Sequence, residues 1–237
     1  MPTFSESDDL RGARFVGADL SEAVMRGVQI TGADIDAPWL LEGDGSLWVN
    51  GVDVVPCVEA EVNRRFPGRS LRRATDPDGL RAAWSALEST WGRTLARALA
   101  MPAGTVDVSV AGEWSFAQTL RHLVLATDMW LGRGVLEIAQ PFHPIGQVDT
   151  QSQGELESFA TVTPSFDEVL EVRAGRAGMV RDFLATVTPE ELAASRRNPH
   201  NPEFPETTLS CLHVILEEEW EHHRYAVRDL DVIASRP

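Results

Sequence analysis

Beyond residue 75, apolar residues recur with the period of an α-helix. Asp76 and Pro77 fit the N-cap and the first position of a helix, and apolar residues then follow at steps of four and three. Three later segments share this period and span about residues 115–136, 165–183 and 208–233. The second of these opens with a capping box of Ser165 and Glu168. Four amphipathic helices of roughly 20 residues predict a four-helix bundle.

The connection between the second and third of these helices is long. It covers residues 139–164 and includes the proline-containing stretch Pro141–Gly146. Connections of this length inside a compact domain are unusual unless they cross the domain or cover a site. We therefore expect a long crossover between helices two and three, and a bundle that is not simply up-down-up-down.

Near the N-terminus the chain repeats every five residues. Bulky apolar side chains recur with this spacing, each preceded two positions earlier by a small residue, and Gly-Ala-Asp occurs twice. The bulky positions are Phe15, Leu20, Met25, Ile30 and Ile35. A period of five fits neither a helix nor an ordinary strand, but it suits a chain that turns a corner every five residues. The pattern resembles the pentapeptide repeat, whose fold is a square right-handed β-helix. Since so few repeats make little more than one coil, we expect a small β appendage.

A hairpin and a short helix are predicted after the repeats. Asn50-Gly51 lies between β-favouring residues and is typical of a tight hairpin turn. Residues 58–66 read as a short helix that ends at Pro67-Gly68. We therefore predict a mainly α protein with an N-terminal β segment over residues 1–70 and a four-helix bundle over residues 71–237.

Composition narrows the classes of function. The 237 residues include 36 acidic and 21 basic side chains, a formal net charge of −15, which argues against a nucleic-acid partner because phosphate binding depends on clustered basic residues. No apolar run reaches the roughly 18 residues of a membrane span, and the N-terminus lacks an export signal pattern. Cys57 and Cys211 lie far apart. These features predict a reduced, cytoplasmic protein that binds neither nucleic acid nor membrane.

The last helix carries the most informative polar residues. Glu219 and His223 lie four residues apart, in register with the apolar positions Leu212, Leu216, Val227 and Leu230. Glu218 and His222 form a second such pair in a more polar series, which fits the flank of the helix. Burying an unpaired carboxylate costs several kcal/mol. A metal ion is therefore the expected partner of Glu219 and His223.

A third ligand is expected from the second helix. His122 is the best candidate because it lies on a semi-polar face of that helix. His122, Glu219 and His223 leave at least one coordination position open, as in catalytic zinc sites. Imidazole and carboxylate ligands also suit nickel, iron or manganese, so the metal is a divalent ion with zinc favoured.

A histidine on helix two and a His-His-Arg segment on helix four resemble the DinB/YfiT-like metal-binding superfamily over about residues 76–233. The His/Glu/His set is similar to that of the N-terminal domain of the mycothiol-dependent maleylpyruvate isomerases. This resemblance maps His122, Glu219 and His223 onto three zinc ligands. It implies an enzyme in which zinc lowers the pKa of a small thiol such as mycothiol for transfer to an electrophile. In that family a second domain follows the bundle, whereas here the extra residues precede it, so isomerisation of maleylpyruvate is not expected.

Three further residues are candidates for substrate binding. His143 lies in the crossover, His222 flanks the predicted ligands, and Arg224 follows them, although helix geometry turns Arg224 about 100° away. Two functions remain open. One is a metal- and thiol-dependent transferase or related enzyme. The other is a non-enzymatic protein, structural or stress-related, in which the metal stabilises the bundle and the β appendage mediates homodimerisation.

Overall fold

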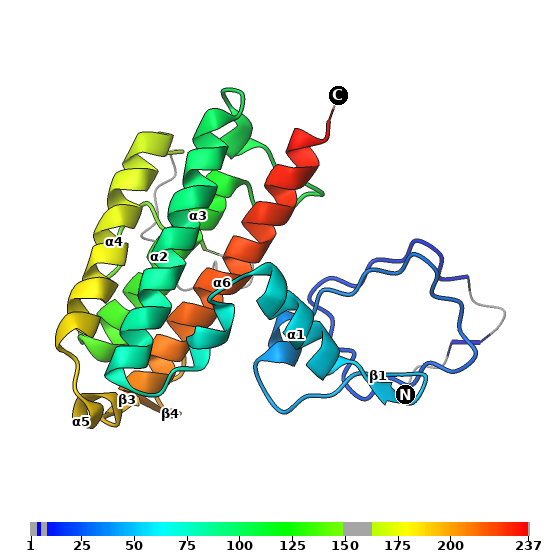
Figure 1. Ribbon diagram of the computed structural model, residues 1–237, viewed down its shortest axis with the longest axis horizontal. Coiled ribbons are helices and arrows are strands. Elements are labelled where there is room, and N and C mark those ends of the chain that lie inside the picture. The colour runs from blue at the N-terminus through cyan, green and yellow to red at the C-terminus, as the bar shows by residue number, and fades with distance from the viewer. Residues whose placement is uncertain (1–3, 6–8, 149–162, 237) are drawn as a thin grey trace. The chain divides into compact units, whose positions relative to one another are not determined.

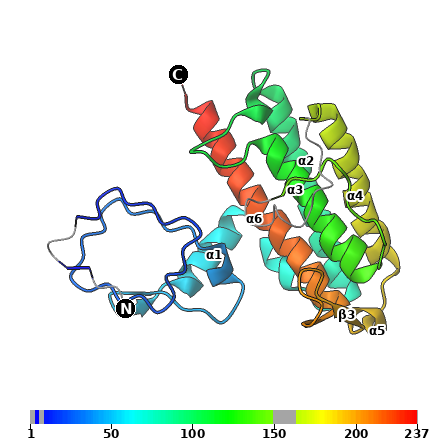
Figure 2. The ribbon, with the colours of Figure 1, turned by 180° about the vertical axis from the view of Figure 1, so that it is seen from behind.

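The computed structural model describes residues 4–5, 9–148 and 163–236 (Figures 1 and 2). The chain divides into two compact units, Met1–Ala37 and Pro38–Pro237. The sequence predicts a boundary near residue 70, whereas the structure groups residues 38–70 with the bundle. The reason is a set of contacts made by buried arginines, described below.

Four long helices form the second unit and lie alongside one another in both views (Figures 1 and 2). They are α2 (Pro77–Ala100), α3 (Phe116–Thr127), α4 (Phe166–Thr186) and α6 (Thr208–Ala234). Helices α2 and α3 each pack against both α4 and α6. The prediction of a mainly α bundle is confirmed. Within the described part of the chain, no helix combines the length and the apolar character needed to cross a bilayer.

Side-chain caps begin these helices where the sequence predicts them. The Asp76 side chain accepts a hydrogen bond of 2.9 Å from the Gly79 backbone N–H. Ser165 and Glu168 form a reciprocal capping box in front of α4. Such caps satisfy backbone N–H groups that have no partner inside the helix, and each is worth about 1 kcal/mol.

The core lies where the four helices meet. Its fully buried apolar side chains come from all four of these helices and include Leu80, Leu87, Leu123, Val169, Val180, Ile215 and Leu230. Each buried side chain of this size stabilises the fold by about 1.5–3 kcal/mol relative to leaving it exposed. Apolar packing therefore fixes the faces of the helices, and any polar side chain on the same faces must find a partner inside the protein.

The second predicted helix is built in two parts. Helix α3 is followed directly by a π-helix, Asp128–Val135, in which the backbone is wound more widely. After it the chain returns along α3 as an irregular segment as far as Val148. The predicted crossover over residues 139–164 lies partly in residues 149–162, which are outside the described residues.

Short elements precede the bundle within the second unit. In order they are the 3-10 helix η1 (Pro38–Leu41), strands β1 (Trp48–Val49) and β2 (Val52–Asp53), helix α1 (Val55–Arg65) and the 3-10 helix η2 (Arg69–Arg73). The two strands pair as an antiparallel hairpin. Asn50 and Gly51 form its turn with φ values of 50° and 80°, as such a two-residue turn requires.

Two buried arginines join these short elements to the bundle. Arg69 and Arg72 are each only 1% exposed. Arg69 donates hydrogen bonds of 3.0 Å to Glu59 on α1 and to Glu221 on α6. Arg72 also donates to Glu59, and to the carbonyl oxygen of Leu41. These bonds tie η1, α1 and η2 to α6, which is why the boundary lies before them.

A small hairpin lies between α4 and α6. Strands β3 (Ser195–Arg197) and β4 (Pro205–Thr207) pair antiparallel after the short helix α5 (Pro189–Leu192). This hairpin is not predicted from the sequence.

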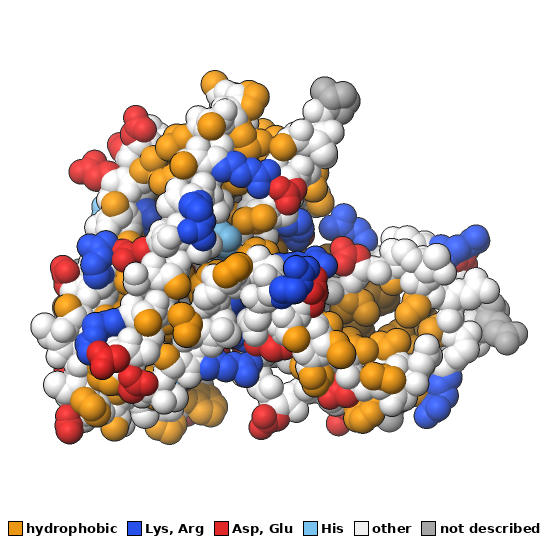
Figure 3. Space-filling model, viewed as in Figure 1, with side chains coloured by type: hydrophobic (Ala, Val, Ile, Leu, Met, Phe, Trp, Pro, Cys, Tyr) orange, Lys and Arg blue, Asp and Glu red, His pale blue; other side chains and the backbone are white. Residues whose placement is uncertain are grey.

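The first unit turns at every fifth residue. Gly12, Gly17, Glu22, Gly27 and Gly32 all have φ between 62° and 79°, the left-handed region that favours glycine. The predicted period of five therefore corresponds to a repeated left-handed turn. The bulky positions of the repeat remain between 52% and 62% exposed in this unit, and Figure 3 shows hydrophobic side chains along the coil.

Candidate metal centre

Helix α6 presents its two Glu–His pairs on two different faces. Glu218 and His222 lie on the face toward α3, with side-chain exposures of 33% and 16%. Glu219 and His223 lie on the adjacent face and are 1% and 3% exposed. Glu218 and His222 are therefore the pair that is partly exposed to solvent and that faces the imidazole of another helix.

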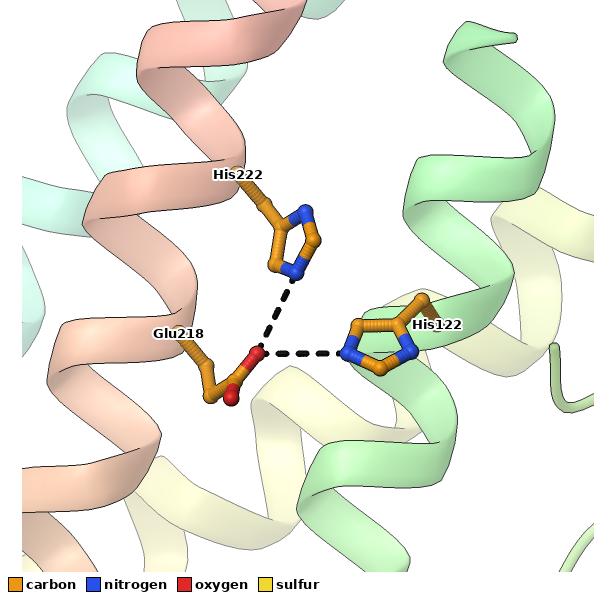
Figure 4. A group of neighbouring side chains, drawn as sticks. All are labelled: His122, Glu218 and His222. Carbon is orange, nitrogen blue, oxygen red and sulfur yellow. Dashed lines mark hydrogen bonds and ion pairs between the residues drawn. The ribbon is translucent and has the colours of Figure 1, made fainter. Parts of the chain in front are cut away.

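His122 on α3 meets the first pair (Figure 4). One carboxylate oxygen of Glu218, Oε2, lies 3.2 Å from Nε2 of His122 and 3.2 Å from Nε2 of His222. One ligand atom from each of the three residues lies within 4.8 Å of the others. Among the described residues, this is the one group of three or more His, Cys, Asp or Glu side chains with such geometry.

The spacing of these atoms fits a small divalent cation. Zinc binds imidazole nitrogen and carboxylate oxygen at about 2.0–2.1 Å, so adjacent ligands of a tetrahedral site lie about 3.3–3.4 Å apart. The two N···O distances of 3.2 Å are close to that value. These two distances suit a cation shared by His122, Glu218 and His222, whose ligand atoms all lie within 4.8 Å of one another.

Contacts around the group orient its imidazoles. The backbone oxygen of Gln147 lies 3.2 Å from Nδ1 of His122, the ring nitrogen remote from Glu218. Trp114 packs against both rings, with its centroid 4.7 Å from that of His122 and 5.9 Å from that of His222. Histidine ligands of metals are commonly held in this way, through a hydrogen bond to the nitrogen that does not bind the ion.

The structure does not bring together the predicted trio of His122, Glu219 and His223. Glu219 accepts a short hydrogen bond from Arg173 of α4. Nε2 of His223 lies 2.8 Å from Oγ1 of Thr94 on α2. Among the described residues, the structure therefore places Glu218 and His222, and not the predicted Glu219 and His223, beside His122 as a candidate metal-binding group.

Glu219 is buried as predicted, but its partner is an arginine and not a histidine of α3. The apolar period of α6 does place Glu219 and His223 in the core, as predicted. A buried carboxylate needs a partner, and in this bundle the partner is an arginine that reaches across the core. Arg173 follows Val169 by four residues on α4, so it interrupts a buried apolar face in the same way as Glu219 does. An arginine at a core position was the signal that could have shown how Glu219 is paired.

Electrostatics distinguish the two carboxylates on α6. Burial alone would raise the pKa of Glu218, but the hydrogen bonds from His122 and His222 outweigh it and lower that pKa well below its usual range. Burial raises the pKa of Glu219, opposed in part by Arg173. Glu218 is therefore a carboxylate anion near neutral pH, which is the form that binds a metal.

Burial also lowers the pKa values of two histidines of α6, His222 and His223. Burial lowers the pKa of His222, although Glu218 opposes the shift. Burial lowers the pKa of His223 to about 4, with a smaller contribution from Arg93. Neutral imidazole is the metal-binding form, so burial favours the state of His222 that can act as a ligand.

The three residues predicted to bind substrate have separate surroundings. His222 belongs to the cluster itself. His143 donates its backbone N–H to Asp128 and accepts the Ile145 N–H on Nδ1. Arg224 donates to Glu221 at 2.9 Å, and its guanidinium lies 4.5 Å from the ring centre of Tyr225. The structure thus gives His143 and Arg224 local partners outside the cluster.

Sequence reasoning missed two contributors to the cluster. Glu218 was assigned to the flank of α6, yet its i,i+4 spacing to His222 was a visible signal. Trp114 precedes the N-cap of α3 by one residue and shows no sequence pattern that marks it as a partner of His122.

Comparison with known families agrees with this architecture. Residues 86–226, more than half of the chain, match the family model of the DinB superfamily. Residues 9–36 match pentapeptide repeats in eight copies. Searches of curated proteins and of solved structures returned no match. The four-helix bundle and the extent of the family match show that the chain belongs to the DinB superfamily and carries pentapeptide repeats ahead of the bundle.

Proposed function

We propose that this protein binds one divalent metal ion through His122, Glu218 and His222 and uses it in thiol-dependent chemistry on a small electrophile. The observation that carries the proposal is the convergence of two imidazole nitrogens and a carboxylate oxygen from two helices. This donor set suits zinc best and also accommodates nickel, iron or manganese.

The residues of the site have distinct roles in this proposal. His122 and His222 offer their Nε2 atoms, while Glu218, kept ionised by its low pKa, offsets part of the positive charge. The Gln147 carbonyl holds the His122 ring by its other nitrogen. Trp114 covers one side of both imidazoles and keeps bulk water from that side.

A divalent ion held in this way supplies a Lewis acid with a free coordination position, and such ions lower the pKa of a thiol into the physiological range. The choice of a thiol, and of a mycothiol-type molecule in particular, follows from the resemblance to the mycothiol-dependent isomerases. The exposure of the Glu218 side chain is consistent with access of a small molecule to the site.

Metal content tests the first part of the proposal. We expect wild-type protein to bind one equivalent of zinc by calorimetry and by elemental analysis after isolation. Glu218→Gln should weaken zinc binding by at least about 100-fold, more than is typical for a residue that only supports a ligand. Glu217→Gln, one residue away on α6, is the matched control and should bind like wild type. Equal binding by wild type and Glu218→Gln would contradict the assignment.

Thiol binding tests the second part. Zinc-loaded protein should bind at least one low-molecular-weight thiol, mycothiol included in the panel, and should transfer it to an electrophile in a reaction followed by mass spectrometry. The alternative is a metal that only stabilises the bundle, which the position of the cluster between α3 and α6 also permits. In that case zinc raises the melting temperature, while no thiol binds and no conjugate forms.

A further inference from the structure

The segment after the π-helix is fastened to α3 by Arg121. The Arg121 Nε–H donates a hydrogen bond of 2.8 Å to the carbonyl oxygen of Ile145. The backbone N–H of Gln147 donates to the carbonyl oxygen of Arg121 at 3.3 Å. The Ile145 side chain is buried in the core between these two bonds. Arg121 therefore holds the segment through both its side chain and its backbone.

The same segment has a second anchor on the π-helix. Asp128 is 1% exposed and accepts a 2.8 Å hydrogen bond from the backbone N–H of His143. Arg176 of α4 also donates to Asp128, so the carboxylate is itself held in place. The Gly146 N–H closes a turn by donating to the carbonyl oxygen of His143. The position of Gln147 is thus determined by bonds on both sides of the turn.

This placement has a direct effect on the metal centre. The carbonyl oxygen of Gln147 accepts from Nδ1 of His122. A histidine that donates from Nδ1 to a fixed acceptor has its ring orientation set, and a metal would take the place of the Nε2 proton that His122 shares with Glu218. Nε2 is the atom of His122 that points at Glu218 (Figure 4).

We propose that Arg121 is a positioning residue for the metal centre: by holding Ile145 and Gln147 it aims the Gln147 carbonyl at His122 and fixes the imidazole in its metal-binding orientation. The inference rests on the proposed function, because it concerns the same ion. It assigns a role to the proline-containing segment between α3 and α4 that the ligands alone do not explain.

The surroundings of Arg121 support this role. Its guanidinium makes no ion pair with the described residues, whereas Arg173 and Arg176 on the facing helix are each paired with a carboxylate. Removing a cation from water without a counter-charge is costly. The hydrogen bond from Arg121 to the Ile145 carbonyl oxygen offsets part of this cost.

Zinc affinity of the full chain tests the proposal. Arg121→Met removes the donor to Ile145 while keeping much of the aliphatic side chain, and it should weaken zinc binding about 10- to 100-fold, as is typical when a metal-binding histidine loses its support. Arg133→Met is the matched control, since Arg133 is an exposed arginine on the π-helix, and it should bind zinc like wild type. Arg121→Lys, which keeps a donor at this position, should recover part of the affinity.

Two further measurements separate positioning from folding. Affinities are compared well below the melting temperature of each metal-free variant, and the cobalt(II)-loaded proteins are compared by absorption spectroscopy, where Arg121→Met should show altered ligand-field bands. In metal-free protein, the Gln147 amide should exchange its hydrogen at least about 10-fold faster in Arg121→Met, because the segment that carries Gln147 has lost the side-chain bond to Ile145.

The outcomes distinguish this inference from the proposed function. If wild type takes up no zinc, the proposed function fails, and Gln147 exchange still reports whether Arg121 holds the segment. If wild type binds zinc and Arg121→Met binds it equally well with an unchanged cobalt spectrum, the positioning role is overturned while the metal centre stands.

Discussion

The pairing of Arg173 with Glu219 predicts a large effect on stability that leaves metal binding intact. Arg173→Met removes the cation that neutralises Glu219, whose side chain is 1% exposed in the bundle core. The carboxylate is then left without its charged partner among apolar side chains. Because this pair lies on a different face of α6 from Glu218 and His222, the zinc affinity of the folded variant should remain within a few-fold of wild type.

The size of the effect follows from the burial of the pair. Removing one partner of a buried ion pair costs about 3–5 kcal/mol. For a domain of this size, 1 kcal/mol corresponds to about 2–4 °C in melting temperature, so the expected decrease is roughly 6–20 °C. The double variant Arg173→Met with Glu219→Leu should regain much of this loss, since it no longer buries a lone carboxylate.

The effect should also depend on pH with a definite sign. Burial raises the pKa of Glu219 in the folded protein, and loss of Arg173 raises that pKa further. A folded-state pKa above the unfolded value means that the folded protein binds more protons, so stability falls as pH rises through the folded pKa. Arg173→Met should therefore lose more stability relative to wild type at pH 8 than at pH 5.5.

Urea denaturation followed by circular dichroism at both pH values measures these differences, with zinc calorimetry on the same samples. A loss below about 1 kcal/mol that does not change with pH would refute the claim that Glu219 depends on Arg173. Loss of zinc binding by folded Arg173→Met would show instead that the Arg173–Glu219 pair is coupled to the metal centre.

Three other predictions follow from local features. His222→Ala should lower zinc affinity by at least about 100-fold, whereas His200→Ala, an exposed histidine, should not change it; competition calorimetry measures both. A maleimide at pH 7.5 should modify exposed Cys57 quickly and leave Cys211 unmodified in the native state, because burial raises the pKa of Cys211 to about 11. Intact mass spectrometry after timed quenching shows which cysteine reacts first, and equal rates at the two cysteines would contradict the prediction. Glu22→Gly should stabilise the coil of the first unit by up to about 1 kcal/mol, because Glu22 has a left-handed backbone at a position where the other four turns have glycine. The expected result is slower backbone hydrogen exchange in that unit.

Much of the fold was predictable because it depends on local signals. The Asp76 cap, the capping box at Ser165 and the Asn50-Gly51 turn each rest on a few adjacent residues whose chemistry does not need the rest of the chain. The apolar period of α6 likewise identifies its buried face without knowledge of its neighbours.

The metal centre was less predictable because it depends on which helices meet. Two adjacent Glu–His pairs satisfy the same i,i+4 rule, and sequence periodicity ranks them by burial. Burial was a misleading criterion here: the more buried pair, Glu219 and His223, meets Arg173 and Thr94, while the flanking pair meets His122. Only the arrangement of α3, α4 and α6 in space decides between these partners.

The buried arginines Arg69 and Arg72 bear on how a shortened form of this protein should be designed. The family match begins at residue 86, and a chain trimmed to that point would lack both arginines and leave Glu221, the neighbour of His222, without one of its two guanidinium partners. It would also remove the helix whose Glu59 neutralises those arginines. Expression of the bundle for biophysical work is therefore best started at Pro38, which retains Glu59, Arg69, Arg72 and Glu221 together.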